Sequence, residues 1–108
     1  MRSVKVFSHN ILAGILTENN DDSFTFCYED NYYKNPECSS ISLTLPKTQQ
    51  KFHSNTFFPF FSNILPEGVN RRVQSRILKI DEEDSFGLLM ALEKNDFIGA
   101  VTIEKIEV

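Results

Sequence analysis

The chain has 108 residues, of which 41% are hydrophobic and 24% charged, and its 11 Lys and Arg residues against 15 Asp and Glu residues give a formal net charge of −4. This balance predicts one globular domain over residues 1–108 and disfavours a disordered chain, which has fewer apolar residues and more net charge. The mild acidity also disfavours a nucleic-acid-binding surface, which is typically basic.

Three segments in the first quarter are predicted as β-strands: 3–8, 11–17 and 24–28. The first and the third show the side-chain alternation with a period of two that is typical of strands, and the second would return from the first. His9 and Asn10 fit a two-residue turn, so the first two segments are expected to pair as a hairpin. Gly14 interrupts the second segment, which suggests a bulge or a close approach of another backbone. The third segment places three aromatic residues on one face: Phe24, Phe26 and Tyr28.

The next stretch of sequence predicts one more strand between two polar connections. Residues 29–40 are polar and are expected to form a loop. Residues 41–45 alternate again, which predicts a fourth strand that Pro46 ends. Residues 47–55 are polar and predict a flexible loop. The first half is therefore expected to be mostly antiparallel strand.

The hydrophobic period changes in the second half. Residues 56–65 predict a short helix that begins close to Pro59, because proline is tolerated in the first turn of a helix. Three residues could cap its start: Ser54, Asn55 or Thr56. Pro66 is expected to end this helix and to open the next one.

A second helix is predicted from Glu67 onward. Its four apolar residues recur at spacings of four, four and three and form one helical stripe: Val69, Val73, Ile77 and Ile80. Four polar residues are expected to cover the remaining surface of the helix: Arg71, Arg72, Gln74 and Arg76.

The chain is expected to close with a third helix and a strand. Ser85 can cap the helix, which runs through Leu92, and residues 97–104 predict the strand. The order of elements predicts an α+β fold, with a small, mainly antiparallel β-sheet or barrel-like domain and two to three short helices in the second half.

Recognisable catalytic and metal-binding motifs are absent from the sequence. His9 and His53 stand at no ligand spacing from Cys27 or Cys38. The four glycines are isolated, so they form no glycine-rich phosphate loop. The acidic residues 81–84 are interpreted as a solvated turn that favours the start of the following helix. We therefore expect a protein that is not an enzyme and has no cofactor or metal.

The cysteines and the chain's hydropathy indicate a cytoplasmic protein. Cys27 and Cys38 are interpreted as free thiols in a reducing compartment. The first residues contain no apolar run of signal-peptide length. The longest apolar stretches are far shorter than the roughly 20 residues that a membrane span needs.

Two local features indicate a surface that binds another molecule. Arg71, Arg72 and Arg76 form either a solvated helix face or a set of forked donors for carboxylates or phosphate. The net acidity favours a protein partner over DNA. Five of the ten residues from Phe52 to Phe61 are Phe, and a short helix cannot bury all of its aromatic residues on one side. At least one is expected at an interface, and the spacing leaves open which one.

Four segments, in this order and at these spacings, carry a family resemblance: 43–46 (LTLP), 60–68 (FFSNILPEG), 86–89 (FGLL) and 99–101 (GAV). They resemble the N-terminal subdomain of HipA-type Ser/Thr kinases. In particular, the chain is similar to HipS-like proteins, the free-standing homologues of that subdomain in three-gene HipBST toxin–antitoxin systems. No residue of a kinase active site belongs to the matching segments.

The resemblance implies an antitoxin that binds and inhibits a HipT-like Ser/Thr kinase. It also implies a HipB-like DNA-binding protein as a further partner in a ternary complex, with no direct contact between this chain and nucleic acid or membrane. The expected docking surface comprises nine residues: Phe57, Phe58, Phe61, Leu65, Pro66, Glu67, Arg71, Arg72 and Arg76. Two alternatives stay open, an accessory domain that binds nucleic acid and one that binds a small ligand in an apolar pocket between the aromatic helix and the sheet.

Overall fold

The computed structural model describes residues 2–63, 65, 68–91 and 101–106. Its strands are β1 (Arg2–Ser8), β2 (Ile11–Glu18), β3 (Phe24–Tyr28), β4 (Lys51–Ser54) and β5 (Val101–Lys105). Its helices are α1 (Asp30–Lys34), α2 (Pro59–Ser62), α3 (Gly68–Leu78) and α4 (Ser85–Ala91). In these residues the strands form one antiparallel sheet in the order β4-β3-β2-β1-β5. The predicted α+β class with an antiparallel sheet is confirmed, and the sheet is open rather than closed into a barrel.

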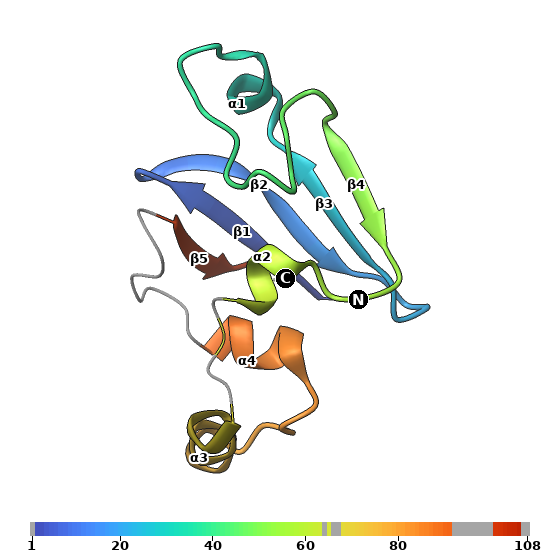
Figure 1. The fold of residues 1–108 in the computed structure, drawn as a ribbon, viewed down its shortest axis with the longest axis vertical. Helices are drawn as coiled ribbons and strands as arrows, with labels where there is room; N and C mark the ends of the chain where they lie inside the picture. The colour runs from blue at the N-terminus through green and yellow to red at the C-terminus, as the bar shows by residue number, and fades with distance from the viewer. Residues whose placement is uncertain (1, 64, 66–67, 92–100, 107–108) are drawn as a thin grey trace.

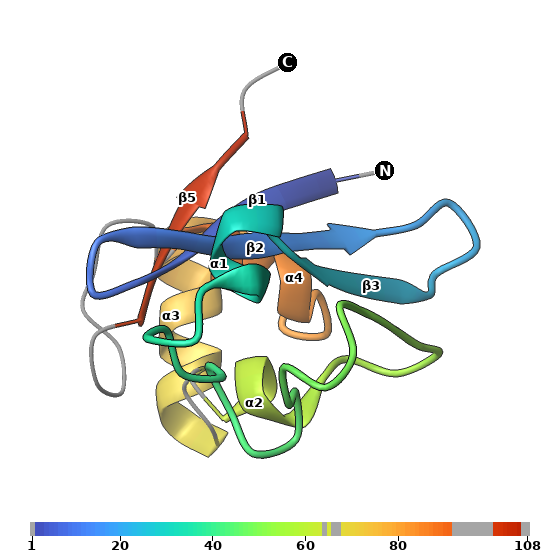
Figure 2. The same cartoon turned by 90° about the horizontal axis from the view of Figure 1, so that it is seen from above.

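The sheet forms one layer, and α2, α3 and α4 lie on one side of it (Figures 1 and 2). The long loop between α1 and β4 lies on the same side (Figure 2). α3 lies beyond α4, at the end of the molecule opposite α1 (Figure 1). This arrangement places the core between the sheet and α2 and α4, and it leaves α3 at the periphery.

The β1–β2 hairpin forms as predicted. His9 and Asn10 both have left-handed backbone conformations, with φ of 52° and 65°, as the tight two-residue turns that match strand twist require. The register then shifts: Val6 pairs with Gly14, but Phe7 pairs with Leu12, so Ala13 is an extra residue. A Cβ atom on Gly14 would lie 2.4 Å from the backbone oxygen of Cys27. Both the bulge and the close approach predicted from Gly14 are therefore present.

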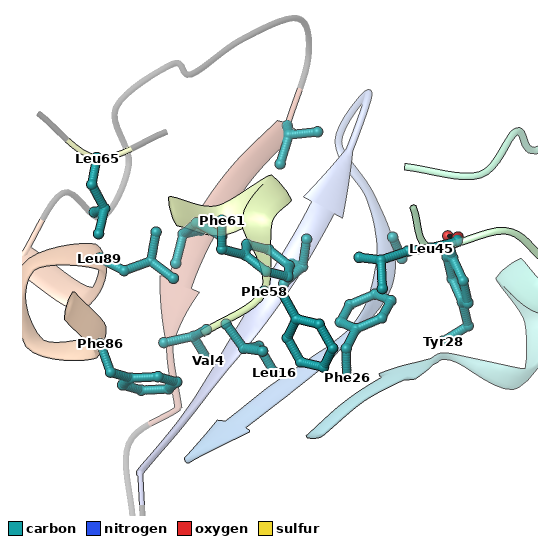
Figure 3. Packing of buried hydrophobic residues seen from close by; sticks show 14 of the residues in the cluster. Val4, Leu16, Phe26, Tyr28, Leu45, Phe58, Phe61, Leu65, Phe86 and Leu89 are labelled. Atoms are coloured by element: carbon teal, nitrogen blue, oxygen red, sulfur yellow. Dashed lines mark hydrogen bonds between the residues drawn. The ribbon is translucent and has the colours of Figure 1, made fainter. Parts of the chain in front are cut away.

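Aromatic side chains join the sheet to the helices. The Phe26 ring on β3 lies 4.9 Å from that of Tyr28 and 5.8 Å from that of Phe61 on α2, measured between centroids. Phe24, at the start of β3, contacts Phe57 at 5.2 Å and stacks on Phe86 of α4 at 6.4 Å. Figure 3 shows Phe26, Phe58 and Phe61 converging with Leu16 over the sheet. Such ring pairs add about 0.5–1.5 kcal/mol each beyond the area that they bury.

The predicted strand at 41–45 is wrong, because this segment forms turns and the fourth strand is β4 at Lys51–Ser54, inside the predicted flexible loop. The Tyr28 hydroxyl decides the conformation of the segment: it accepts from the Ile41 amide at 3.1 Å and donates to the Leu45 carbonyl. Leu45 is buried, whereas Leu43 is 98% exposed. The alternation therefore does not put these side chains on one face.

A short helix, α1, occupies part of the polar connection predicted at 29–40. The Glu29 carboxylate caps it by accepting from the backbone amides of Asn31 and Tyr32 at 3.0 and 3.3 Å. Lys47 then holds the following loop, since its Nζ donates to the carbonyls of Asn35 and Cys38 at 2.7 and 2.6 Å. The loop before β4 is thus fixed by side-chain hydrogen bonds.

Two predicted helix caps are corrected by the structure. α2 begins at Pro59 as expected, but Phe58 takes the cap position without a side-chain hydrogen bond, and the Ser54 hydroxyl instead accepts from the Thr56 amide. Asp84, not Ser85, caps α4, because its Oδ1 accepts from the Gly87 amide at 3.0 Å. The predicted extension of α4 to Leu92 and the part of the last strand at 97–100 lie outside the described residues.

Asp84 also joins α4 to the sheet through Arg2. The Arg2 guanidinium donates to both carboxylate oxygens of Asp84, at 3.0 and 2.8 Å, and to both of Glu18, at 2.7 and 2.8 Å. It also lies over the Phe86 ring at 5.2 Å. This arginine therefore links β1, β2 and the start of α4.

We expect this link to make stability depend on acid pH. The hydrogen bond from Arg2 holds the pKa of the Asp84 carboxyl below its usual range. A depressed carboxyl pKa stabilises the fold above the unfolded pKa, and this contribution is lost as the pH falls through the folded pKa. Asp84→Asn should cost about 1 kcal/mol at pH 7, and this difference from the wild type should shrink below about pH 4. Urea unfolding at about pH 7 and pH 3 measures it, and a pH-independent difference would contradict the assignment.

Candidate protein-docking surface

Four of the nine residues predicted to bind a partner lie in the aromatic core. Phe58, Phe61 and Leu65 are buried, so their side chains are not presented at the surface of the domain. Phe57 is half-buried and its ring packs against those of Phe24 and Phe86. These residues anchor α2 and the segment after it to the sheet. Pro66 and Glu67 lie outside the described residues.

The three arginines of α3 have different environments. Arg71 is half-buried and ties α3 to the segment that precedes α4, because its Nε donates to the Glu82 carbonyl at 2.8 Å and its Nη2 to the Ser85 hydroxyl at 2.9 Å. Arg72 and Arg76 are exposed, and neither guanidinium bonds another residue within the described part of the chain. Arg72 and Arg76 are therefore the predicted docking residues on α3 that remain available.

The apolar stripe of α3 faces solvent. Val69, Val73 and Ile77 are 69%, 47% and 67% exposed. The opposite side of the helix faces the domain through Arg71, the buried Ser75 and the partly buried Leu78. Of the four polar residues expected to cover the remaining surface of the helix, Arg72, Gln74 and Arg76 are exposed, whereas Arg71 is half-buried and bonds within the domain.

Hydrogen bonds at the end of α3 explain how a polar side can pack inward. The buried Ser75 hydroxyl donates to the Arg72 carbonyl at 2.9 Å, so it carries no unpaired donor into the interior. Lys79 has a φ of 56°, and the Ile80 amide donates to the Ser75 carbonyl at 3.0 Å, the pattern of a Schellman motif. This reversal turns Ile80 back against the core, while the other three members of the stripe stay outside.

The edges of the exposed stripe differ in charge. Successive helical residues are about 100° apart, which places Arg72 and Arg76 along one edge of the stripe. The same geometry places Asn70 and Gln74 along the other edge. The outer face of α3 is therefore an apolar stripe with a cationic edge and a neutral polar edge. We call Val69, Val73, Ile77, Arg72 and Arg76 the α3 face.

A cavity of about 460 Å³ lies between α2, the β1–β2 hairpin and the loop after α1. Phe60 of α2, Ser8 and Ile11 of the hairpin and the loop around Cys38 and Ile41 line it. Its volume falls within the range of ligand pockets, so it is where a small ligand would bind under that alternative. Within the described residues no group of three or more His, Cys, Asp or Glu side chains is placed to hold a metal ion. No helix in that same part of the chain is long and apolar enough to cross a membrane.

The fold and the α3 face together define a small α+β domain in which α3 exposes its apolar stripe. Comparison with known proteins identifies the domain: the family model for the HipA N-terminal domain matches residues 4–104. The chain belongs to the HipA N-terminal domain family. This membership relates it to the HipA toxins and so to toxin–antitoxin systems, and it confirms the resemblance carried by the sequence motifs.

Individual relatives agree with the family assignment. A solved structure of the "N-terminal domain of HipA toxin" superimposes with a TM-score of 0.71 at 32% identity, covering 99% of this chain and 94% of that one. A Haemophilus influenzae protein named "Uncharacterized protein" is 36% identical over 97% of this chain and 93% of its own length. A Sinorhizobium fredii protein named "Putative kinase Y4mE" is 26% identical over 95% of this chain, which spans only 24% of that protein.

Proposed function

We propose that this protein is an antitoxin that binds a HipT-like Ser/Thr kinase and holds it inactive, acting by binding and not by catalysis. A HipB-like DNA-binding protein would join the two in a ternary complex. The observation that carries the proposal is that the same domain occurs in two arrangements among the relatives. It makes up about a quarter of the Sinorhizobium protein and nearly the whole of the Haemophilus protein.

These two arrangements support binding to a kinase for a physical reason. A domain that contacts a kinase core within one chain can make the same contacts when it is a separate chain. A separate domain loses translational and rotational freedom when it binds, and the interface must offset this cost. A free domain of this kind therefore needs an exposed apolar surface, and the α3 face supplies one. Two charged residues that the sequence offered as candidates for chemistry or binding are instead used to hold the fold together. Arg71 bonds Ser85, and Asp84 bonds Arg2.

The test is co-expression with a HipT-like kinase, followed by purification through a tag on the kinase. We expect a stable complex, and we expect phosphorylation by the kinase to fall at least about tenfold when this protein is present in stoichiometric amount. A complex with unchanged kinase activity would contradict inhibition. Failure to form any complex would contradict the proposal and would leave the nucleic-acid and small-ligand alternatives to be tested.

A further inference from the structure

We propose that the α3 face is the surface that docks on the kinase, and that its counterpart is an apolar groove bordered on one side by carboxylates. This inference rests on the proposed function and adds to it the place and the chemistry of the contact. The mode is an amphipathic helix laid into a groove, with anchors at spacings of four residues.

The apolar stripe of α3 is exposed along its whole length. Val69, Val73 and Ile77 lie one above the other on α3, and the residues from the first to the last span about 12 Å. Each is about half exposed or more, and the two other exposed large apolar residues among the described ones, Ile11 and Leu43, lie singly on β2 and on the loop before β4. Burying such a continuous stripe is favourable by about 25 cal/mol for each Å² of apolar surface removed from water. No other described element lies beyond α3 at this end of the molecule (Figure 1).

The helix that carries the stripe is held in place before any partner binds. The two hydrogen bonds of Arg71 fix the helix to the segment before α4, and the Ile80 amide fixes its end. Ser75 is buried against the domain. A stripe on a preorganised helix binds without the further entropy cost of ordering that helix.

The charge of α3 selects the partner's chemistry. α3 contains three arginines and no acidic residue, within a chain whose net charge is −4. Arg71 is used inside the domain, which leaves Arg72 and Arg76 four residues apart along one edge of the stripe. Guanidinium groups bind carboxylates through paired hydrogen bonds. The kinase surface should therefore present carboxylates along the border that meets this edge.

A second copy of this chain does not fit the α3 face as well. Pairing two α3 helices antiparallel would place Arg72 and Arg76 of one copy against the same residues of the other. Pairing them parallel would place the arginines against Asn70 and Gln74, which carry no negative charge. The charge pattern therefore favours a different protein with an acidic border.

The experiment compares two substitutions of the same kind at two exposed apolar positions. Val73→Glu puts a carboxylate in the centre of the stripe, and Leu43→Glu puts one on the loop before β4, where the side chain is 98% exposed. Glutamate is at least as good a helix former as valine, so Val73→Glu should not unfold α3. We expect Val73→Glu to raise the dissociation constant of the complex with the kinase at least about 30-fold. Leu43→Glu should leave this constant within about twofold of the wild-type value.

A double variant tests the charged edge. Arg72→Gln with Arg76→Gln should weaken kinase binding about tenfold at low salt and should make the remaining affinity less dependent on salt. Gln74→Ala, on the opposite edge of the same helix, is the matched control and should bind as the wild type does. An unchanged salt dependence in the double variant would overturn the acidic border.

The outcomes separate this inference from the proposed function. If the wild type binds the kinase and Val73→Glu binds equally well, the docking surface lies elsewhere and the inference is wrong. If Leu43→Glu alone loses binding, the loop is the docking surface and the inference is also wrong. Concentration-dependent dimers of the isolated protein that Val73→Glu abolishes, or binding to phosphatidylserine-containing vesicles that it abolishes, would assign the α3 face to another occupant. If the wild type does not bind the kinase at all, the proposed function itself fails.

Discussion

Phe61→Ala should lower the free energy of unfolding by about 3–5 kcal/mol, the range for removing a buried phenyl group from a core. Phe61 is fully buried, and its ring lies within 6.4 Å of the rings of Phe57, Phe58 and Phe60 and 5.8 Å from that of Phe26. α2 has only four residues and no side-chain cap, so it depends on this packing. Urea unfolding at neutral pH, compared with the wild type, measures the loss.

The matched control is Phe60→Ala, which removes the same group from the preceding residue of α2, where the side chain is only half-buried. It should cost clearly less than Phe61→Ala, about 1–2 kcal/mol. A loss below about 1 kcal/mol for Phe61→Ala would show that α2 is not anchored through this ring. Inhibition of the kinase should decline with the folded fraction in Phe61→Ala, whereas Val73→Glu should lose binding with its stability intact.

The first three strands could be predicted from the sequence because the signals that form them are local. The period of two holds in β1 and β3 and is broken in β2 only around the bulge, and the turn at His9 and Asn10 joins neighbours in the chain. Gly14 also correctly predicted a close approach of another backbone, since only a residue without a Cβ atom fits so close to β3. The class of fold followed from these elements.

The fourth strand could not be predicted, because the deciding contacts are distant in sequence. Residues 41–45 alternate as a strand does, yet the Tyr28 hydroxyl bonds both ends of this segment from β3. Lys47 adds two hydrogen bonds to the preceding loop. These hydrogen bonds join residues that are 9 to 17 positions apart in the chain, so no local pattern announces them.

The exposure of the residues expected to dock could be predicted only in part, because aromatic clustering has the same appearance in a core and at an interface. Phe58 and Phe61 belong to the core, while Arg72 and Arg76 are exposed. The spacing of Val69, Val73 and Ile77 predicted a helical stripe but not the direction that it faces. That direction depends on Arg71, which donates to the Glu82 carbonyl, and on Ser75, whose hydroxyl donates to the Arg72 carbonyl of its own helix. An inward serine and arginine are polar residues that periodicity alone assigns to solvent.

Gly14→Ala should lower the free energy of unfolding by about 3 kcal/mol, at the upper end of the cost of inserting an extra methyl group into a packed site. The added Cβ would lie 2.4 Å from the Cys27 carbonyl oxygen and 2.8 Å from Cζ of Phe26. The oxygen belongs to the backbone of β3, and the Phe26 ring is fully buried, so neither can move aside cheaply. β2 and β3 would have to separate at the centre of the sheet. Thermal and urea unfolding both measure the loss.

Gly68→Ala provides the contrast that separates a steric clash from backbone strain. Gly68 has a φ of 59°, and a Cβ atom added there would have no neighbour within 4 Å. Alanine at this position therefore meets only the left-handed backbone penalty of about 1–2 kcal/mol. If Gly14→Ala costs no more than Gly68→Ala, β3 can shift away from β2 at this point. The bulge at Ala13, next to Gly14 on β2, would then be where the sheet absorbs the added methyl group.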